Sequence, residues 1–377
     1  MAQYEIKNGV GIIPEGTTEI ENPGFKGCTE LTSVVIPDSV KSIDVGVFEG
    51  CTGLKSVVIP DSVTKIGWSA FSGCTGLVNV VIPDSVTTIG QSAFLNCSGL
   101  TNVVIGKSVT EIEWLAFSGC TGLTSIVIPN SVEEMGFAAF EGCTALKSVV
   151  IGNSITEIEH HTFHQCTALS DITIPDSVTT IGYNAFEDCT SLTTINIPNS
   201  VTEIDNFVFV GCTSLTSIVL PESLSKINRC VFDKCSSLSN VVIPNSVTAI
   251  RENAFSGCTA LKTISIPSSV TELEGRAICD MGLTELIIPE TVKKIGYGAI
   301  INCKELKSLT LLCPITIQEI LWNCPSLETI SLGAGIKKIN EKIFDDSVKV
   351  INVPAKKTEY YKKRLPEKYH GLIVEQS

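Results

Sequence analysis

Apolar residues recur at eight fixed places within a unit of 23 residues, which repeats along most of the chain. Counted from its first residue, the unit reads C-T-x-L-x-x-V-x-I-P-x-S-V-x-x-I-G-x-x-A-F-x-G. The alternation around positions 7 and 9 predicts a short strand, which the proline at position 10 ends. Positions 13 and 16 predict a second extended stretch, and positions 20 and 21 predict a short helical or 3₁₀ turn. The glycine at position 17, Gly67 in one unit, is expected to turn the chain with a positive φ.

One such unit has too little apolar surface to fold alone, but stacked units bury a continuous core. The sequence therefore predicts one solenoid domain of roughly 14 coils over residues 1–354. Its parts are a partial unit in 1–27, regular repeats in 28–280 and irregular repeats in 281–354. The Lys-rich segment 355–377 is expected to form a helical cap, broken near Pro366, over the last coil.

The repeats resemble the BspA-like (Treponema pallidum type) leucine-rich repeat, on the consensus L-x-x-V-x-I-P-x-S-V-x-x-I-G-x-x-A-F-x-G-C-x-x-L over about residues 14–354. They depart from the commonest leucine-rich repeats, because Pro-Asp-Ser or Pro-Asn-Ser follows the strand where those repeats carry Asn or Cys. The resemblance implies an α/β repeat solenoid, a curved horseshoe with a parallel sheet on its concave face, short second strands and helical or 3₁₀ turns outside. It further implies a bacterial surface or secreted protein that adheres to host matrix proteins or other cells.

Cysteine opens every unit from Cys28 to Cys258, and the chain holds 16 cysteines in all. Neighbouring cysteines would lie within reach of a disulfide, but side chains in a stacked column run parallel, whereas a bridge or a tetrahedral metal site needs them to converge. Because cysteine is among the most buried residue types, a column of buried thiols is favoured. Cys230 stands at position 19, outside this column, and is expected to be more exposed, as a reactive thiol or as an inert surface cysteine.

His160, His161 and His164 form the one dense group of histidines in the sequence. Three imidazoles on one turn could hold a transition metal. They occupy positions 18, 19 and 22, which vary from unit to unit, so a solvated outer turn is the favoured interpretation. No metal site is predicted.

The sequence contains neither H-E-x-x-H nor G-x-S-x-G, and its 4 histidines leave little capacity for acid–base chemistry. Serine and threonine recur at fixed positions 2 and 12, as turn residues do. We therefore expect no enzyme, no catalytic residues and no cofactor.

The net charge of −13 makes the surface acidic. Such a surface repels nucleic acid and anionic membranes, which are excluded as partners. No run of 18 apolar residues predicts membrane insertion, and the N-terminal residues show no secretory signal. The localisation stays unknown, although the resemblance suggests the cell surface or secretion.

Position 8 lies on the predicted strand but points away from the core, and it holds valine in six successive units from Val35 onwards. Positions 5 and 6 beside it are polar. An exposed apolar stripe with a polar border is typical of a binding site, although valine could also stand there for its β-propensity alone. The candidate ligand-binding residues are Val58, Val81, Val104, Val127, Val150, Thr173 and Asn196.

A second candidate surface is the aromatic row at position 18, which comprises Trp68, Trp114, Phe137 and Tyr183. These rings could stack on sugars or anchor a protein, or they could shield the edge between coils. The first hypothesis is therefore a monomeric, non-enzymatic scaffold whose partner is a host or neighbouring-cell protein. The alternatives are a glycan-binding module and a structural spacer without a ligand.

Overall fold

The computed structural model describes residues 3–376 except 315, 318–319, 337 and 340–346. The chain divides into two compact units, Met1–Ser200 and Val201–Ser377. It makes about 15 turns of a β-solenoid with parallel sheets, so the predicted solenoid is confirmed. The predicted boundaries stay predictions, and part of the segment 281–354 lies outside the described residues.

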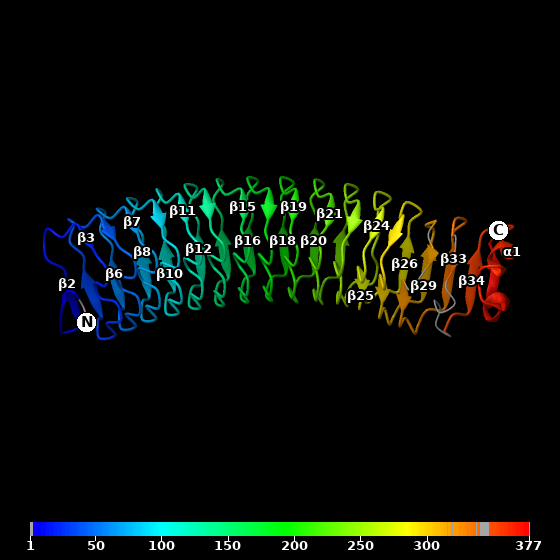
Figure 1. The fold of residues 1–377 in the computed structure, drawn as a ribbon, viewed down its shortest axis with the longest axis horizontal. Coiled ribbons are helices and arrows are strands. Elements are labelled where there is room, and N and C mark those ends of the chain that lie inside the picture. Colours follow the sequence, from blue (N-terminus) through cyan, green and yellow to red (C-terminus); the bar gives the residue numbers. More distant parts are fainter. Residues whose placement is uncertain (1–2, 315, 318–319, 337, 340–346, 377) are drawn as a thin grey trace. The chain divides into compact units, whose positions relative to one another are not determined.

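The first strand of a regular coil in Met1–Ser200 is three residues long, and the proline at position 10 follows it closely. Paired strands run parallel in a register of 23 residues, as for Val34 and Val57, so equivalent residues of successive coils lie side by side (Figure 1). These strands are β2 (Val10–Ile12), β4 (Ser33–Val35), β6 (Ser56–Val58), β8 (Asn79–Val81), β10 (Asn102–Val104), β12 (Ser125–Val127), β14 (Ser148–Val150), β16 (Asp171–Thr173) and β18 (Thr194–Asn196).

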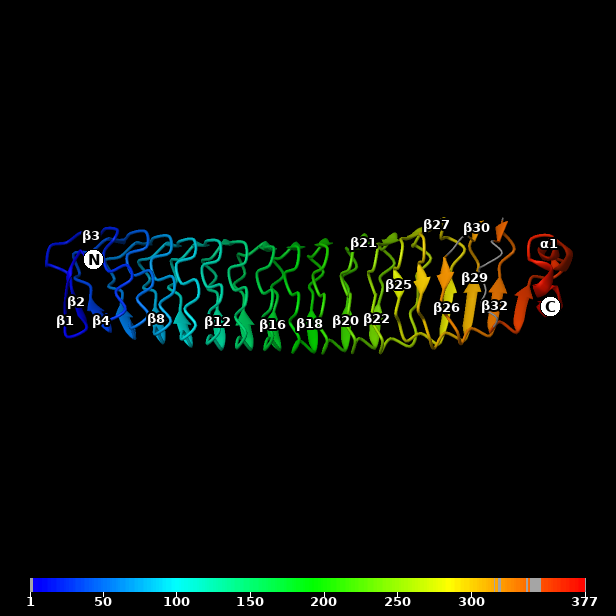
Figure 2. The same ribbon diagram turned by 60° about the horizontal axis from the view of Figure 1, so that its bottom comes forward.

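Second strands of two residues form another row on the opposite side of each coil (Figures 1 and 2). They are β3 (Glu19–Ile20), β5 (Ser42–Ile43), β7 (Lys65–Ile66), β9 (Thr88–Ile89), β11 (Glu111–Ile112), β13 (Glu134–Met135), β15 (Glu157–Ile158) and β17 (Thr180–Ile181). Gly67 follows β7 without a positive φ, so the expected role of this glycine is wrong. A Cβ on Gly67 would come within 2.8 Å of the Asp44 backbone, so glycine is needed there for the close approach of two coils.

The core between the two rows consists of columns of similar apolar side chains, one from each coil. Phenylalanine rings at position 21 of neighbouring coils stack at centroid distances such as 5.0 Å between Phe48 and Phe71 and 5.2 Å between Phe71 and Phe94. Val57, Ile59 and the other expected core positions are buried with them. The dispersion and burial that hold a coil therefore come mainly from its two neighbours.

The N-terminal edge of Met1–Ser200 is closed by a hairpin. β1 (Glu5–Lys7) pairs antiparallel with β2 through Asn8 and Gly9, which both have positive φ, as two-residue hairpin loops require. Glu5 and Lys7 are exposed on β1, and such charges discourage pairing with another chain at a sheet edge.

Val201–Ser377 repeats the same plan, with regular coils up to Cys258 and irregular coils after it. Its first strands are β20 (Ser217–Val219), β22 (Asn240–Val242), β26 (Glu285–Ile288), β29 (Ser308–Leu311), β32 (Thr329–Leu332) and β34 (Val350–Val353). Its second strands are β19 (Glu203–Ile204), β21 (Lys226–Ile227), β23 (Ala249–Ile250), β24 (Glu272–Leu273), β27 (Lys294–Ile295), β30 (Thr316–Ile317) and β33 (Lys338–Ile339). A third row is formed by β25 (Ile278–Cys279), β28 (Ile300–Ile301) and β31 (Leu321–Trp322).

The expected helical or 3₁₀ outer turns are not found in the described coils. The regular coils have hydrogen-bonded turns at positions 20 and 21, and where isoleucine replaces phenylalanine, at Ile278 and Ile300, the turn becomes a strand because β-branched residues favour extended backbone. The α/β horseshoe is thus not confirmed in detail. No described helix is long and apolar enough to cross a membrane.

The segment after Pro354 closes the C-terminal end of Val201–Ser377 (Figure 2). It contains α1 (Thr358–Lys362), the 3₁₀ helix η1 (Glu367–Leu372) and β35 (Ile373–Glu375), which pairs parallel with β34. Tyr361 is fully buried and its hydroxyl donates a hydrogen bond to the Gly333 carbonyl. The segment therefore supplies both a strand for the last sheet edge and an apolar side chain for the last coil.

Candidate functional site

Six exposed valines form a continuous column on the first strands of Met1–Ser200. Their exposed fractions run from 48% at Val104 to 76% at Val58. This valine column consists of Val35, Val58, Val81, Val104, Val127 and Val150. At the strand spacing of a sheet it spans roughly 24 Å.

The valine column continues into polar residues at Thr173 and Asn196, which are also exposed. Most residues at positions 5 and 6 beside it are polar, as at Lys55 and Ser56, although Val78 adds an exposed apolar side chain at position 5. The structure thus brings all seven predicted residues onto one outward surface, the first-strand face. Whether that surface binds a ligand stays a prediction.

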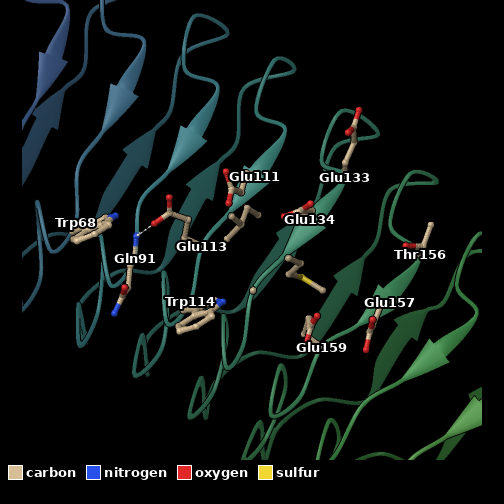
Figure 3. A pocket seen from close by; sticks show the side chains of 13 residues that line it. Trp68, Gln91, Glu111, Glu113, Trp114, Glu133, Glu134, Thr156, Glu157 and Glu159 are labelled. Atoms are coloured by element: carbon tan, nitrogen blue, oxygen red, sulfur yellow. Dashed lines mark hydrogen bonds between the residues drawn. The ribbon is translucent and has the colours of Figure 1, made fainter.

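The aromatic row at position 18 is divided by its surroundings. Trp68 and Trp114 are 54% and 61% exposed, and both border a hollow on the second-strand side (Figure 3). Phe137 and Tyr183 instead pack on the ring of His161, at centroid distances of 5.1 and 5.7 Å. The predicted row is therefore two separate sites rather than one.

The hollow has a volume of about 630 Å³ and is strongly acidic. A column of three glutamates crosses it, because Glu111, Glu134 and Glu157 each begin a second strand. Like charges that face each other on paired strands destabilise a sheet, so a ligand that donates hydrogen bonds would relieve the repulsion here. The residues that line the hollow are Trp68, Gln91, Glu111, Ile112, Glu113, Trp114, Glu133, Glu134, Met135, Gly136, Thr156, Glu157 and Glu159.

The carboxylates of the hollow influence one another. Burial, and next the charges of Glu113 and Glu134, raise the pKa of Glu111. The Glu113 carboxylate accepts a hydrogen bond of 2.7 Å from the backbone N–H of Gln91, which lies between the two indoles (Figure 3).

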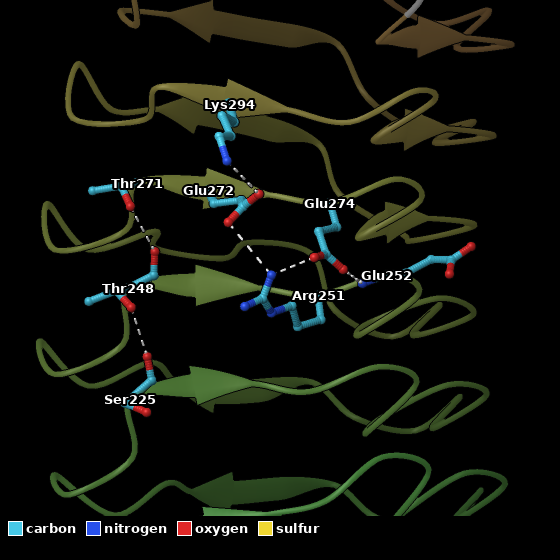
Figure 4. Close-up of polar contacts among 8 residues, drawn as sticks. All are labelled: Ser225, Thr248, Arg251, Glu252, Thr271, Glu272, Glu274 and Lys294. Carbon is cyan, nitrogen blue, oxygen red and sulfur yellow. Dashed lines mark hydrogen bonds and ion pairs between the residues drawn. The ribbon is translucent and has the colours of Figure 1, made fainter.

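The second-strand side of Val201–Ser377 has a different charge arrangement. Arg251 there lies between Glu272 and Glu274, and Lys294 Nζ is 3.6 Å from Glu272 Oε1 (Figure 4). Cations thus accompany these carboxylates, whereas glutamates gather around the hollow of Met1–Ser200.

The three histidines do not form a solvated turn. His164 keeps only 17% of its side chain exposed, and its Nδ1 lies 2.8 Å from Glu141 Oε1 on the preceding coil. Burial, and next the neighbouring His164, lower the pKa of His161. His160 faces elsewhere, because its Nδ1 accepts the backbone N–H of Tyr183 at 2.7 Å. Sequence reasoning missed Glu141, which was visible only as the residue that stands 23 places before His164.

All 16 cysteines are free and buried, which for the column from Cys28 to Cys258 is what the preferred interpretation expected. Most of the cysteines at position 1, here called the ladder thiols, donate to the carbonyl of a phenylalanine 26 residues earlier, as at 3.1 Å from Cys97 Sγ to Phe71 O. Burial raises the pKa of Cys97 to about 12, which keeps its thiol protonated and unreactive. Cys230 is only 5% exposed and burial raises its pKa too, so the expectation of a more exposed thiol there is wrong.

Comparison with known proteins agrees with this geometry. A family model described as BspA type leucine rich repeat region, in 6 copies, matches residues 18–147, 133–258 and 225–351. The structure is similar to that of a leucine-rich repeat protein from Bacteroides ovatus ATCC 8483, with 29% identity, 97% of this chain and 83% of that chain covered, and a TM-score of 0.63. None of the curated proteins matches the chain.

Two further solved structures show weaker likeness. One is a leucine rich cell surface protein from Faecalibacterium prausnitzii A2-165, with 28% identity, 84% of this chain and 77% of that chain covered, and a TM-score of 0.43. The other is a leucine rich repeat protein from T. pallidum, with 29% identity, 48% of this chain and 77% of that chain covered, and a TM-score of 0.38.

Proposed function

Because the chain belongs to the family of BspA-type leucine-rich repeats, we propose that it is a non-enzymatic scaffold that binds a protein ligand on its first-strand face. The observation that carries this proposal is the valine column, six exposed apolar side chains in unbroken succession. Exposed apolar surface with a polar border is what a protein interface uses at its centre and rim.

The β-propensity of valine does not account for the valine column by itself. Thr173 and Asn196 occupy the same place on strands of the same three-residue length, so the core does not require valine there. We further propose that the ligand is a matrix or cell-surface protein and that the chain acts outside a bacterial cell. Both parts of this proposal rest on the family resemblance.

The proposal predicts that polar replacement of the valine column weakens binding without unfolding the chain. The triple variant Val81→Ser, Val104→Ser and Val127→Ser should bind at least about tenfold more weakly, because each valine loses roughly 1 kcal/mol or more of apolar burial. Surface plasmon resonance against a panel of purified extracellular-matrix proteins measures the effect.

A matched control for this experiment is Val45→Ser, which replaces a valine that is 41% exposed outside the valine column. It should leave the affinity unchanged. Equal affinity of the triple variant and the unaltered chain would contradict the first-strand face as the binding surface, and no binding to any matrix protein would contradict that class of ligand.

A second candidate function is glycan binding at the hollow, which the two exposed indoles beside carboxylate acceptors favour. Tryptophan faces stack on sugar rings, and carboxylates accept hydrogen bonds from sugar hydroxyls. The acidic lining favours neutral over sulfated or sialylated sugars, because like charges repel.

Glycan binding predicts a different set of sensitive residues. The double variant Trp68→Ala and Trp114→Ala should lose binding to neutral glycans on an array, whereas Phe137→Ala should retain it because Phe137 does not line the hollow. Retained binding by the double variant, or a preference for anionic glycans, would contradict the hollow as the glycan-binding site.

A further inference from the structure

The outer turns of successive coils bring histidines and carboxylates together at one place in Met1–Ser200. Glu141, His164 and Glu187 all stand at position 22 of their units and therefore form a column, and His161 lies three residues before His164. Two groups result, Glu141–His161–His164 and His164–Glu187–Asp188, and within each group all the donor atoms lie within 4.8 Å of one another.

His164 is at the centre of this column and has a carboxylate at each ring nitrogen. Its Nδ1 is 2.8 Å from Glu141 Oε1 and its Nε2 is 3.6 Å from Glu187 Oε2. Metal-binding histidines usually have a carboxylate or carbonyl on the nitrogen that does not bind the metal, because it fixes the tautomer and the direction of the ring. Glu187 can serve this purpose when Nδ1 is the ligand atom.

The ring of His161 is held by its neighbours. It packs against Phe137 at 5.1 Å and Tyr183 at 5.7 Å, and its centroid is 5.2 Å from that of His164. Aromatic walls on the two adjacent coils restrict its rotamers, so the ring is ordered before any ligand arrives.

We propose that Glu141, His161 and His164 bind one divalent transition-metal ion such as Zn²⁺, with Glu187 orienting His164. Two imidazole nitrogens and one carboxylate oxygen suit Zn²⁺, Co²⁺ or Ni²⁺, whereas Ca²⁺ and Mg²⁺ prefer oxygen ligands alone. Donor atoms around a tetrahedral zinc ion lie about 3.3 Å apart. Small side-chain rotations would therefore bring the three donor atoms, now within 4.8 Å of one another, to this distance. The alternative group at Asp188 has one imidazole and is the weaker donor set.

The test is calorimetric titration of the full, metal-stripped chain with Zn²⁺ in the presence of excess Mg²⁺. One ion should bind per chain, and Co²⁺ in its place should give a spectrum without thiolate charge transfer, since all 16 cysteines are buried. No Zn²⁺ binding at millimolar concentration, or displacement by Mg²⁺, would overturn the proposal.

Variants for this test can be taken from the repeat itself. His164→Ser introduces the serine that another unit carries at position 22, as Ser118. His161→Asn introduces the asparagine that another unit carries at position 19, as Asn184, whose φ of 57° matches the 58° of His161. Each should lower Zn²⁺ affinity at least about 100-fold, and Glu187→Gln about tenfold, as the loss of an orienting carboxylate does.

The matched control is His160→Gln, which removes an adjacent imidazole outside the donor set and introduces the residue found at Gln91. It should leave Zn²⁺ affinity within about twofold of the unaltered chain. A loss as large as that of His164→Ser would overturn the assignment. X-ray absorption of the unaltered zinc complex gives a check without mutation: two imidazoles and no sulfur are expected, and sulfur ligands would refute the site.

Discussion

At the scale of single residues, the outer turn of each regular coil contains two residues in left-handed backbone conformation, at positions 19 and 23. In Met1–Ser200 the non-glycine residues at position 19 are Ser69, Ser92, Leu115, Ala138, His161 and Asn184, with φ from 53° to 58°. The backbone N–H of Ala138 donates to His160 O on the next coil at 3.0 Å, so stacking imposes a conformation that alanine adopts only with strain.

This strain predicts opposite effects for two neighbouring alanines. Ala138→Gly should raise the free energy of unfolding by about 0.5 kcal/mol, because glycine relieves a penalty of roughly 1–2 kcal/mol at positive φ. Ala139→Gly is the control, since Ala139 is equally buried but lacks a positive φ, and it should lower the same quantity by about 1 kcal/mol. Urea denaturation measures the free energy of unfolding of both variants. An equal loss of stability in the two would contradict the backbone strain at Ala138.

At the scale of elements, much of a coil follows from the order of residues within one repeat. Val57 and Ile59 are buried and Pro60 follows the strand, because alternation and the missing N–H of proline are local causes. The Gly67 turn and the outer helical turns were predicted wrongly, because contacts with the neighbouring coil decide both of them.

Contacts between neighbouring coils also decide which of the candidate sites could be predicted from the sequence. The valine column could be predicted because six successive coils carry valine at position 8. The hollow and the histidine group combine unlike residues from neighbouring coils, such as Glu141 with His164. Only a register of 23 residues, with the outer turn packed tightly enough to half-bury both side chains, brings them into contact.

At the scale of the whole molecule, the buried thiols make stability depend on alkaline pH. All 16 cysteines are free and buried, and burial raises the pKa of ladder thiols such as Cys51, Cys97 and Cys143 to about 12. Below about pH 9, where thiols are protonated in both the folded and the unfolded chain, their contribution to stability is fully present. It is lost as the pH rises from about 9 towards 12, because only the unfolded chain then releases these protons.

Removing one ladder thiol should therefore weaken the dependence on pH. Between pH 9 and 11 the free energy of unfolding should fall with pH in both proteins, but less steeply in Cys97→Ala. The difference between the two slopes should be about 1.4 kcal/mol per pH unit, which corresponds to one proton. Ala93→Gly is the control, a fully buried change in an adjoining turn without a titratable group, which should lower stability at every pH but leave the slope unchanged. Urea denaturation at a series of pH values, with a reductant that is not a thiol, distinguishes the two. An unaltered slope in Cys97→Ala would mean that the thiol already ionises in the folded coil, which its hydrogen bond to the Phe71 carbonyl and its burial both oppose.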